Sequence, residues 1–155
     1  MIEVRNLSFR YNSDLILDNL TFDLLENETI VVIGRSGVGK STLLRCILGL
    51  TRPEAGAILV EGVDITRIKE KELNVIRRDF GMLFQGAALF NSMTVGENVA
   101  FPIRQHREYD EQKIKNIVLE KLTLVGLDGC EDMMPAELSG GMKKRAGLAR
   151  ALALD

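Results

Sequence analysis

Residues 34–41 read G-R-S-G-V-G-K-S, which is the complete pattern G-x-x-x-x-G-K-[S/T] of a phosphate-binding loop. The loop follows the apolar run 29–33, whose β-branched residues are typical of a buried parallel strand. The segment after the loop is expected to be a helix with Leu44, Ile47 and Leu48 on one face. A strand, a glycine-rich loop and a helix in this order are the context that the motif requires. The sequence therefore predicts a chain that binds the phosphates of a nucleoside triphosphate.

The loop residues explain how an anion would be held. Gly34, Gly37 and Gly39 allow the backbone to bend tightly, because no Cβ atom obstructs the turn. Successive N–H groups then face inward as a nest, at the positive end of the following helix. The predicted nucleotide contacts in this block are Gly34, Arg35, Ser36, Gly37, Val38, Gly39, Lys40, Ser41 and Thr42.

Three side chains of the block are given separate roles. Lys40 is expected to reach the β- and γ-phosphates as a catalytic residue, and the Ser41 hydroxyl is expected to coordinate Mg²⁺. Thr42 is placed to add a hydroxyl contact to the α-phosphate. The alternative is a glycine-rich turn that contains a lysine by chance, and the strand and helix beside the loop argue against it.

Composition narrows the class of protein. Of the 155 residues, 46% are hydrophobic and 27% are charged, as in an ordinary globular protein. The net charge of −2 argues against a surface that mainly binds nucleic acid. The basic cluster, 143–145 with Arg150, is either a solvated helix face or a contact with a nucleotide or an acidic partner.

The remaining special residues favour a cytosolic chain. Cys46 and Cys130 are too few for a disulfide framework or a metal site, and Cys46 is expected to be a buried thiol on the helix after the loop. His106 lies in a polar stretch and is predicted to be on the surface. The first residues do not resemble a signal peptide, and no apolar run approaches membrane-spanning length. Any contact with a membrane is therefore expected to go through a partner.

Hydrophobic periodicity predicts alternating strands and helices. Strands are expected over residues 2–9, 21–25, 29–33, 57–60, 63–65 and 80–84. Helices are expected over residues 41–48, 69–78, 94–100, 111–125 and 142–152. Pro102 should end the third helix and Gly126 the fourth. This order indicates an α/β fold with a parallel core, joined to a mostly antiparallel N-terminal part.

A second motif is the block Leu138-Ser-Gly-Gly-Met142. Alone, Ser139 before two glycines could simply be the N-cap of a helix. Together with the phosphate loop and with Phe84-Gln85 at the end of an intervening strand, the block resembles the ATP-binding cassette (ABC) ATPases over the whole chain. The most similar members look like the ATPase subunits of Mla/Mce-type lipid transporters, on the strength of residues 81–85, 88–90, 93–95, 97–102 and 134–139. The stretch 85–90, Gln-Gly-Ala-Ala-Leu-Phe, departs slightly from the usual Gly-Ala-Leu-Phe form.

The resemblance implies a P-loop NTPase core with a parallel sheet, an N-terminal antiparallel β subdomain and a helical subdomain, with ATP and Mg²⁺ as cofactors. A single partial domain is expected over residues 1–155. Its predicted parts are an antiparallel β part (1–28 and 56–66), a P-loop core (29–50 and 80–85), a helical and signature part (86–141) and a post-signature helix (142–155).

The roles of the family's other site residues are implied in the same way. Tyr11 matches the aromatic residue that stacks on adenine, although a hairpin tyrosine that packs locally is the alternative. Gln85 resembles the catalytic glutamine whose carbonyl meets Mg²⁺ and the attacking water, and the alternative is a simple loop amide. The signature residues Ser139, Gly140 and Gly141 would contact the γ-phosphate bound by another protomer.

Partners follow from these roles. Two chains placed head to tail would enclose two ATP molecules, each between the Lys40 loop of one chain and Ser139 of the other. Leu89, Phe90 and Phe101 either fill the core or form a groove that receives a cytoplasmic helix of a permease. The resemblance thus implies a transporter subunit that couples ATP hydrolysis to lipid transport at the cytoplasmic face of the inner membrane, without a nucleic-acid partner.

Part of the family's catalytic machinery has no match in these residues. The family continues with a strand that ends in a Mg²⁺-binding Asp and a catalytic Glu, followed by a switch His. Asp155 follows a helix rather than an apolar β-run, and His106 precedes the signature, so neither is assigned these roles. We expect a truncated cassette that binds nucleotide weakly and has negligible turnover alone.

Three other functions stay open. The chain could be an ABC protein that acts in translation or DNA repair without a permease, a P-loop kinase, or a nucleotide-binding fragment without catalysis. Gln85 and the block 138–142 argue against a kinase, which needs neither. The apolar residues Leu89 and Phe90 and the lack of a basic surface favour the transporter.

Overall fold

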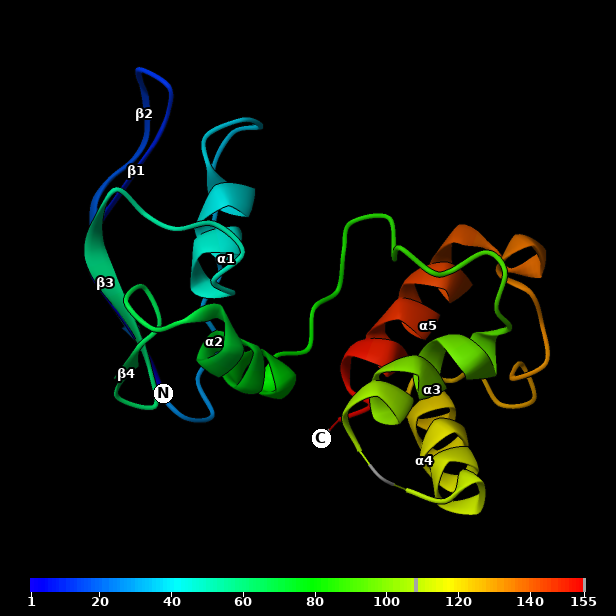
Figure 1. Cartoon of the computed structure of the whole chain (residues 1–155). Coiled ribbons are helices and arrows are strands. Elements are labelled where there is room, and N and C mark those ends of the chain that lie inside the picture. Colours follow the sequence, from blue (N-terminus) through cyan, green and yellow to red (C-terminus); the bar gives the residue numbers. More distant parts are fainter. Residues whose placement is uncertain (108, 155) are drawn as a thin grey trace. The chain divides into compact units, whose positions relative to one another are not determined.

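The computed structural model describes residues 1–107 and 109–154, and it divides into two compact units, Met1–Arg77 and Arg78–Asp155. The first unit is built on a β-sheet and the second on helices (Figure 1). Each unit has its own hydrophobic core. Asp155, for which no metal-binding role was predicted, lies outside the described residues.

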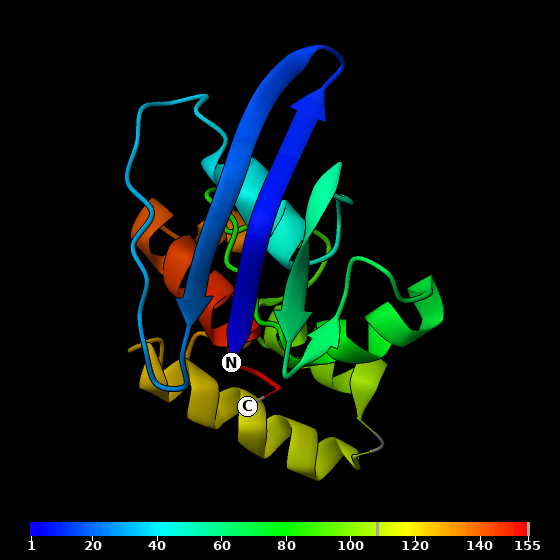
Figure 2. The same cartoon turned by 90° about the vertical axis from the view of Figure 1, so that its left-hand side faces the viewer.

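The sheet of the first unit is antiparallel throughout. Its spatial order is β2-β1-β3-β4, and its strands are β1 (Ile2–Tyr11), β2 (Asp14–Leu24), β3 (Ala55–Val60) and β4 (Val63–Asp64). Figure 2 shows β1 and β2 as a long hairpin, with β3 on the other side of β1. The prediction of an antiparallel N-terminal sheet is confirmed.

β2 is longer than the predicted strand, which began only at Thr21. The register of the hairpin shifts between Val4 and Leu7, where Asn6 adopts a φ of +49°. Asn19 on the opposite strand has the same φ, and its Oδ1 accepts a hydrogen bond from Asn6 Nδ2 at 2.8 Å. An irregularity of this kind displaces the alternation of apolar and polar residues. A search for strict alternation therefore misses the first half of β2.

α1 (Lys40–Ile47) lies on one face of this sheet (Figures 1 and 2). It buries Leu43 and Cys46 in a core that also contains Val4, Leu7, Phe9, Leu17, Ile58, Ile65 and Leu73. Leu44, which was predicted to share a helical face with Ile47 and Leu48, is 49% exposed. Cys46 is buried as predicted, and this burial raises the pKa of its thiol.

Two predicted strands, 29–33 and 80–84, are not strands in the structure. A strand is held by hydrogen bonds to a neighbour, and neither segment pairs with another strand among the described residues. The first segment is open to solvent, with Val31 74% exposed and Ile33 89% exposed. The parallel pairing expected of the P-loop core is therefore not formed within residues 1–107 and 109–154.

The second unit packs the helices α3 (Val95–His106), α4 (Glu111–Leu124) and α5 (Gly140–Ala151) around one core. α2 (Glu70–Ile76) belongs to the first unit and is followed by the 3₁₀ turn Arg77–Asp79; another 3₁₀ turn covers Pro135–Glu137. The fully buried members of the helical core include Val95, Val99, Ile103, Leu122 and Ala146. None of the helices in the described part of the chain is both long and apolar enough to cross a bilayer.

Local signals define the ends of these helices. Thr94 Oγ1 accepts a hydrogen bond from Glu97 N at 3.1 Å, and Glu97 Oε2 accepts one from Thr94 N at 2.7 Å, which is a capping box at the start of α3. Asp110 caps α4 through Lys113 N at 2.7 Å. Gly126, with a φ of +66°, follows the end of α4 as predicted.

α3 continues past Pro102 to His106, so the prediction that Pro102 ends this helix is wrong. A proline inside a helix removes one backbone hydrogen bond and crowds the carbonyl four residues earlier. Val99 and Ile103, on either side of Pro102, are fully buried between α3 and the rest of the core. This packing holds the helix together across the proline. His106 is exposed, as predicted.

Replacing Pro102 with alanine should raise the free energy of unfolding by about 1–2 kcal/mol, because an interior N–H is regained and the crowding of the preceding turn is relieved. Urea unfolding followed by circular dichroism measures the change. Pro135 is the matched control, since it is buried at the first position of a 3₁₀ turn, where proline is favourable. Pro135→Ala should lower stability, and a similar loss in Pro102→Ala would contradict the explanation.

Candidate nucleotide-binding site

The predicted phosphate-binding loop forms a tight turn directly before α1. Residues 36–39 turn the chain, and α1 begins at Lys40. Gly37 and Gly39 have φ angles of +81° and +105°, in the left-handed region that favours glycine. Backbone geometry therefore requires glycine at these two positions.

Lys40 folds back onto the loop that precedes it. Its Nζ donates hydrogen bonds to the carbonyl oxygens of Gly34 and Arg35, both at 2.7 Å. A Cβ atom on Gly34 would lie 2.8 Å from Val38 Cγ1, so the loop closes too tightly for a side chain there. The ammonium group is thus held against the backbone of the loop instead of extending into solvent.

β2 supports the loop from one side, which the sequence reasoning missed. A Cβ atom on Gly39 would lie 2.8 Å from Ile16 Cγ2 and 3.2 Å from Leu17 Cδ2. Both contacts come from the half of β2 that was not predicted to be a strand. The uninterrupted apolar run 15–17 was the available signal for it.

The start of α1 suits an anion. The first N–H groups of a helix have no partner within it, and here no side chain caps them and no acidic residue lies in the first turn. These donors, the Lys40 ammonium group and the exposed Ser41 hydroxyl form a set that fits phosphate oxygens. Ser41 also offers the kind of oxygen that Mg²⁺ binds. Thr42 is buried, so its hydroxyl has the least support among the predicted contacts.

Tyr11 lies at the end of the β1–β2 hairpin, where it pairs with Asp14. The residue is 46% exposed, and its ring meets the ring of Phe9 edge to face, with a centroid distance of 4.8 Å. Tyr11 therefore packs against Phe9 and still exposes part of its surface. Its stacking on adenine stays a prediction.

Gln85 lies in an exposed turn of the second unit. Ala87 N donates to the Phe84 carbonyl oxygen at 2.9 Å and closes this turn. Ala87 and Ala88 then adopt positive φ angles of +62° and +48°. This conformation costs an alanine about 1 kcal/mol or more, so a compensating interaction is needed nearby.

Ser139 is the N-cap of α5, because its Oγ accepts a hydrogen bond from Met142 N at 3.3 Å. Gly140 and Gly141 form the first turn of the helix, and a Cβ atom on either would meet nothing within 4 Å. Neither glycine has a positive φ. Neither packing nor backbone geometry requires glycine at these two positions, and open space adjoins this end of α5.

Two arginines of the predicted basic cluster bond to backbone carbonyls. Arg145 Nη1 donates to the carbonyl oxygens of Val125 and Gly126, at 3.1 and 2.7 Å, and so closes the end of α4. Arg150 donates to two carbonyl oxygens of the turn that follows Gln85. Arg145 is exposed, in line with the solvated-face alternative, whereas Arg150 is half-buried. The sequence gives their charge but not the carbonyls that approach them.

A largely apolar hollow of about 400 Å³ adjoins this turn, lined by Phe80, Met82, Phe84, Phe90, Phe101, Pro102 and Arg150, among others. The Phe90 ring is exposed at the hollow and meets the Phe101 ring at a centroid distance of 4.9 Å. Leu89 instead packs against the helical core. Leu89 therefore fills the core, whereas Phe90 and Phe101 line the hollow, and the docking of a permease helix there stays a prediction.

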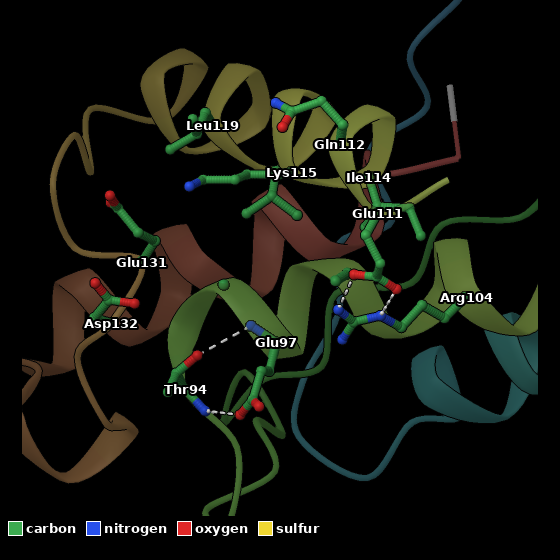
Figure 3. A pocket seen from close by; sticks show the side chains of 13 residues that line it. Thr94, Glu97, Arg104, Glu111, Gln112, Ile114, Lys115, Leu119, Glu131 and Asp132 are labelled. Carbon is green, nitrogen blue, oxygen red and sulfur yellow. Dashed lines mark hydrogen bonds and ion pairs between the residues drawn. The ribbon is translucent and has the colours of Figure 1, made fainter. Parts of the chain in front are cut away.

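Another hollow, of about 350 Å³, lies between α3 and α4 (Figure 3). Arg104 donates two hydrogen bonds to Glu111, at 3.3 and 2.7 Å, and holds the pKa of that carboxyl below its usual value. One carboxylate oxygen of Glu131, which lines the hollow, is buried without a hydrogen-bond partner in the described part of the chain. This hollow contains none of the predicted site residues.

The loop and helix are those of a P-loop protein, and solved structures of ATP-binding cassettes share the fold. "Dimeric Structure of MJ0796, a Bacterial ABC Transporter Cassette" is 33% identical with a TM-score of 0.90, over 99% of this chain and 69% of that chain. A post-hydrolysis dimer of MJ0796 bound to ADP and Pi is 30% identical with a TM-score of 0.89 and the same coverage. The family described as "ABC transporter" matches residues 17–155, and the chain belongs to this family.

Curated relatives are ATP-binding proteins of transport systems. The chain is 51% identical to "Probable ribonucleotide transport ATP-binding protein mkl" of Mycobacterium leprae, over 99% of this chain and 44% of that protein. It is 49% identical to "Intermembrane phospholipid transport system ATP-binding protein MlaF" of Haemophilus influenzae, over 100% and 59%, and 41% identical to MlaF of Escherichia coli K12, over 100% and 58%. The predicted resemblance is confirmed. The chain spans about half the length of these relatives.

Substitution by alanine should have opposite effects on stability at Gly39 of the phosphate loop and at Gly140 of the first turn of α5. Gly39→Ala should lower the free energy of unfolding by about 2 kcal/mol or more, because the methyl group meets Ile16 and the backbone has a positive φ. Gly140→Ala should preserve or raise it by up to about 1 kcal/mol, because the methyl group meets open space in a helix. Guanidinium unfolding measures both, and equal effects would contradict the two assignments.

Proposed function

We propose that this chain is the nucleotide-binding part of an ABC transporter subunit that couples ATP binding and hydrolysis to transport across a membrane. The observation that carries the proposal is the start of α1, where uncapped backbone N–H groups, Lys40 and Ser41 converge behind a glycine loop. The names of the relatives, which all refer to ATP-binding proteins of transport systems, support the step from binding to transport.

Each residue of the loop has a distinct task in this proposal. The backbone N–H groups of 34–42 bind phosphate oxygens, and Lys40 exchanges its two carbonyl contacts for the β- and γ-phosphates. Ser41 and Gln85 would each supply an oxygen to Mg²⁺, and the Gln85 side chain would orient the attacking water. Mg²⁺, when bound, neutralises the charge that develops on the phosphates. Tyr11 stacks on the adenine ring through its exposed surface.

A second protomer completes the site. Ser139, Gly140 and Gly141 present the start of α5 to the γ-phosphate held by the partner, with the two chains placed head to tail. The open space around the two glycines and the dimeric cassettes of similar fold support this arrangement. The anion is favoured there because N–H groups of the first helical turn face it.

A permease is the proposed membrane partner, and the apolar hollow beside Phe84, Phe90 and Phe101 is its proposed docking surface. The aromatic pair beside the Gln85 turn, in which Phe90 is exposed and Phe101 is partly buried, is suited to couple the nucleotide state to the position of a bound helix. The chain would then lie at the cytoplasmic face of the inner membrane, held there through the permease. Nucleic acid is not a proposed partner.

Phospholipid is the proposed cargo, in line with the MlaF relatives and with the Mla/Mce-type motifs of the sequence. The mkl relative favours ribonucleotides as a second candidate, at nearly the same identity. Purification of the whole subunit with its permease, followed by mass spectrometry of bound small molecules, discriminates between the two. Co-purified phospholipid supports the first, and a co-purified ribonucleotide other than ATP or ADP supports the second.

Lys40→Ala should weaken the binding of Mg·ATP to this chain at least tenfold, because a charge-assisted contact worth about 1.5–3 kcal/mol is removed. Isothermal titration calorimetry measures the affinity. Lys71→Ala, an exposed lysine on α2 of the same unit, is the control and should bind like the unaltered chain. Identical affinities in all three folded proteins would refute the proposed nucleotide site.

Phosphate release from ATP by these 155 residues alone should be negligible. The residues bind the triphosphate but supply no matched carboxylate to position the attacking water. A malachite-green assay measures the release, with an active ABC ATPase as the positive control. Equal rates in the two would show that residues 1–155 already contain the catalytic groups.

A further inference from the structure

α5 lies unusually close to the segment that carries Gln85. A Cβ atom on Gly147 would lie 2.9 Å from Leu83 Cδ1 and 3.1 Å from Ala87 Cβ. One turn later, a Cβ atom on Gly81 would lie 2.1 Å from the carbonyl oxygen of Ala151. The segment therefore runs against α5 on both sides of Gln85, without room for another methyl group.

Arg150 joins the two elements at the same place. Its Nη1 donates to the carbonyl oxygen of Ala88 and its Nη2 to that of Ala87, both at 2.8 Å. These are the two alanines with positive φ. Arg150 is half-buried, and burial lowers the pKa of its guanidinium group, which stays charged at neutral pH.

Asn98 on α3 continues this network. It is fully buried, and its side-chain amide accepts from Phe90 N at 2.8 Å and donates to the carbonyl oxygens of Phe90, Met93 and Thr94 at 3.1, 3.2 and 2.9 Å. Arg150 Nη1 lies 3.5 Å from Asn98 Oδ1. The turn after Gln85 is thus tied to two helices by side chains that are largely shielded from water.

We propose that Arg150 is a positioning residue, which fixes the Gln85 turn on the helix that begins at Ser139. Ser139, the predicted γ-phosphate contact, and Gln85, the predicted contact to Mg²⁺ and the attacking water, then belong to one body, so a displacement of Ser139 is transmitted to Gln85. The functional part of this inference rests on the proposed function, whereas the structural part does not. Arg150 does not touch the nucleotide itself.

Arg145 provides a control of the same chemistry. It lies on the same helix and donates to two backbone carbonyls, but those carbonyls close α4 and not the Gln85 turn. Arg145→Met and Arg150→Met therefore remove the same charge and the same number of contacts to the backbone. Only the second should affect Gln85.

Hydrogen exchange of the whole chain, read by mass spectrometry, tests the contact without nucleotide. Arg150→Met should speed exchange in residues 84–93 about tenfold, which corresponds to about 1.4 kcal/mol of lost local stability. Arg145→Met should speed exchange near residues 122–128 and leave 84–93 unchanged. Unchanged exchange of 84–93 in Arg150→Met would overturn the proposal.

Arg150→Lys keeps the charge and one donor group, and should restore part of the protection in 84–93. If Arg150→Met and Arg150→Lys both fail to fold while Arg145→Met folds, Arg150 is a general stabiliser of the core and the proposal is wrong.

Calorimetry with ATP, in Mg²⁺ and in EDTA, tests the action through Gln85. Arg150→Met should reduce the gain in ATP affinity that Mg²⁺ provides as much as Gln85→Ala does. The variant with both substitutions should lose no more of this gain than either single variant. A gain from Mg²⁺ that is intact in Arg150→Met, or losses that add in the double variant, would overturn the positioning role. If neither the unaltered chain nor any variant binds ATP, the proposed function fails. Hydrogen exchange still tests whether Arg150 holds the Gln85 turn.

Discussion

The contact between the start of α1 and the sheet is the constraint on which the candidate site depends. Leu43 and Cys46 fix the helix on the core, and Gly39 brings the preceding loop against Ile16. The helix could not be displaced from this position without opening the core. The direction of the uncapped N–H groups, and with it the place for an anion, is therefore set by packing on the far side of the helix.

Local chemistry made the phosphate loop predictable from the sequence. Gly37 and Gly39 have the positive φ angles for which the motif provides glycine. Ser139 caps α5, as a serine directly before a helix is expected to do. The features that were not predicted from the sequence depend on contacts between segments that are distant in the chain. The first half of β2 was hidden by paired asparagines, and Pro102 is tolerated because Ile103 is buried beside it.

The pairing of strands lies beyond sequence reasoning for a related reason. The β-branched run 29–33 has the composition of a strand, but a strand exists only where a neighbour offers hydrogen bonds. Similarly, the charges of Arg145 and Arg150 are evident in the sequence, whereas the carbonyls that receive them lie up to 63 residues away. Side-chain type is local information, and the partner of a side chain is a property of the fold.

The exposure of Val31 and Ile33 has a consequence for the behaviour of the chain in concentrated solution. The run 30–33 is uncharged, β-branched and free of proline, which is the composition of segments that add to cross-β assemblies. Molecules can therefore associate through this run, edge to edge, in competition with any native neighbour. A single lysine within the run would act as a gatekeeper against such fibrils.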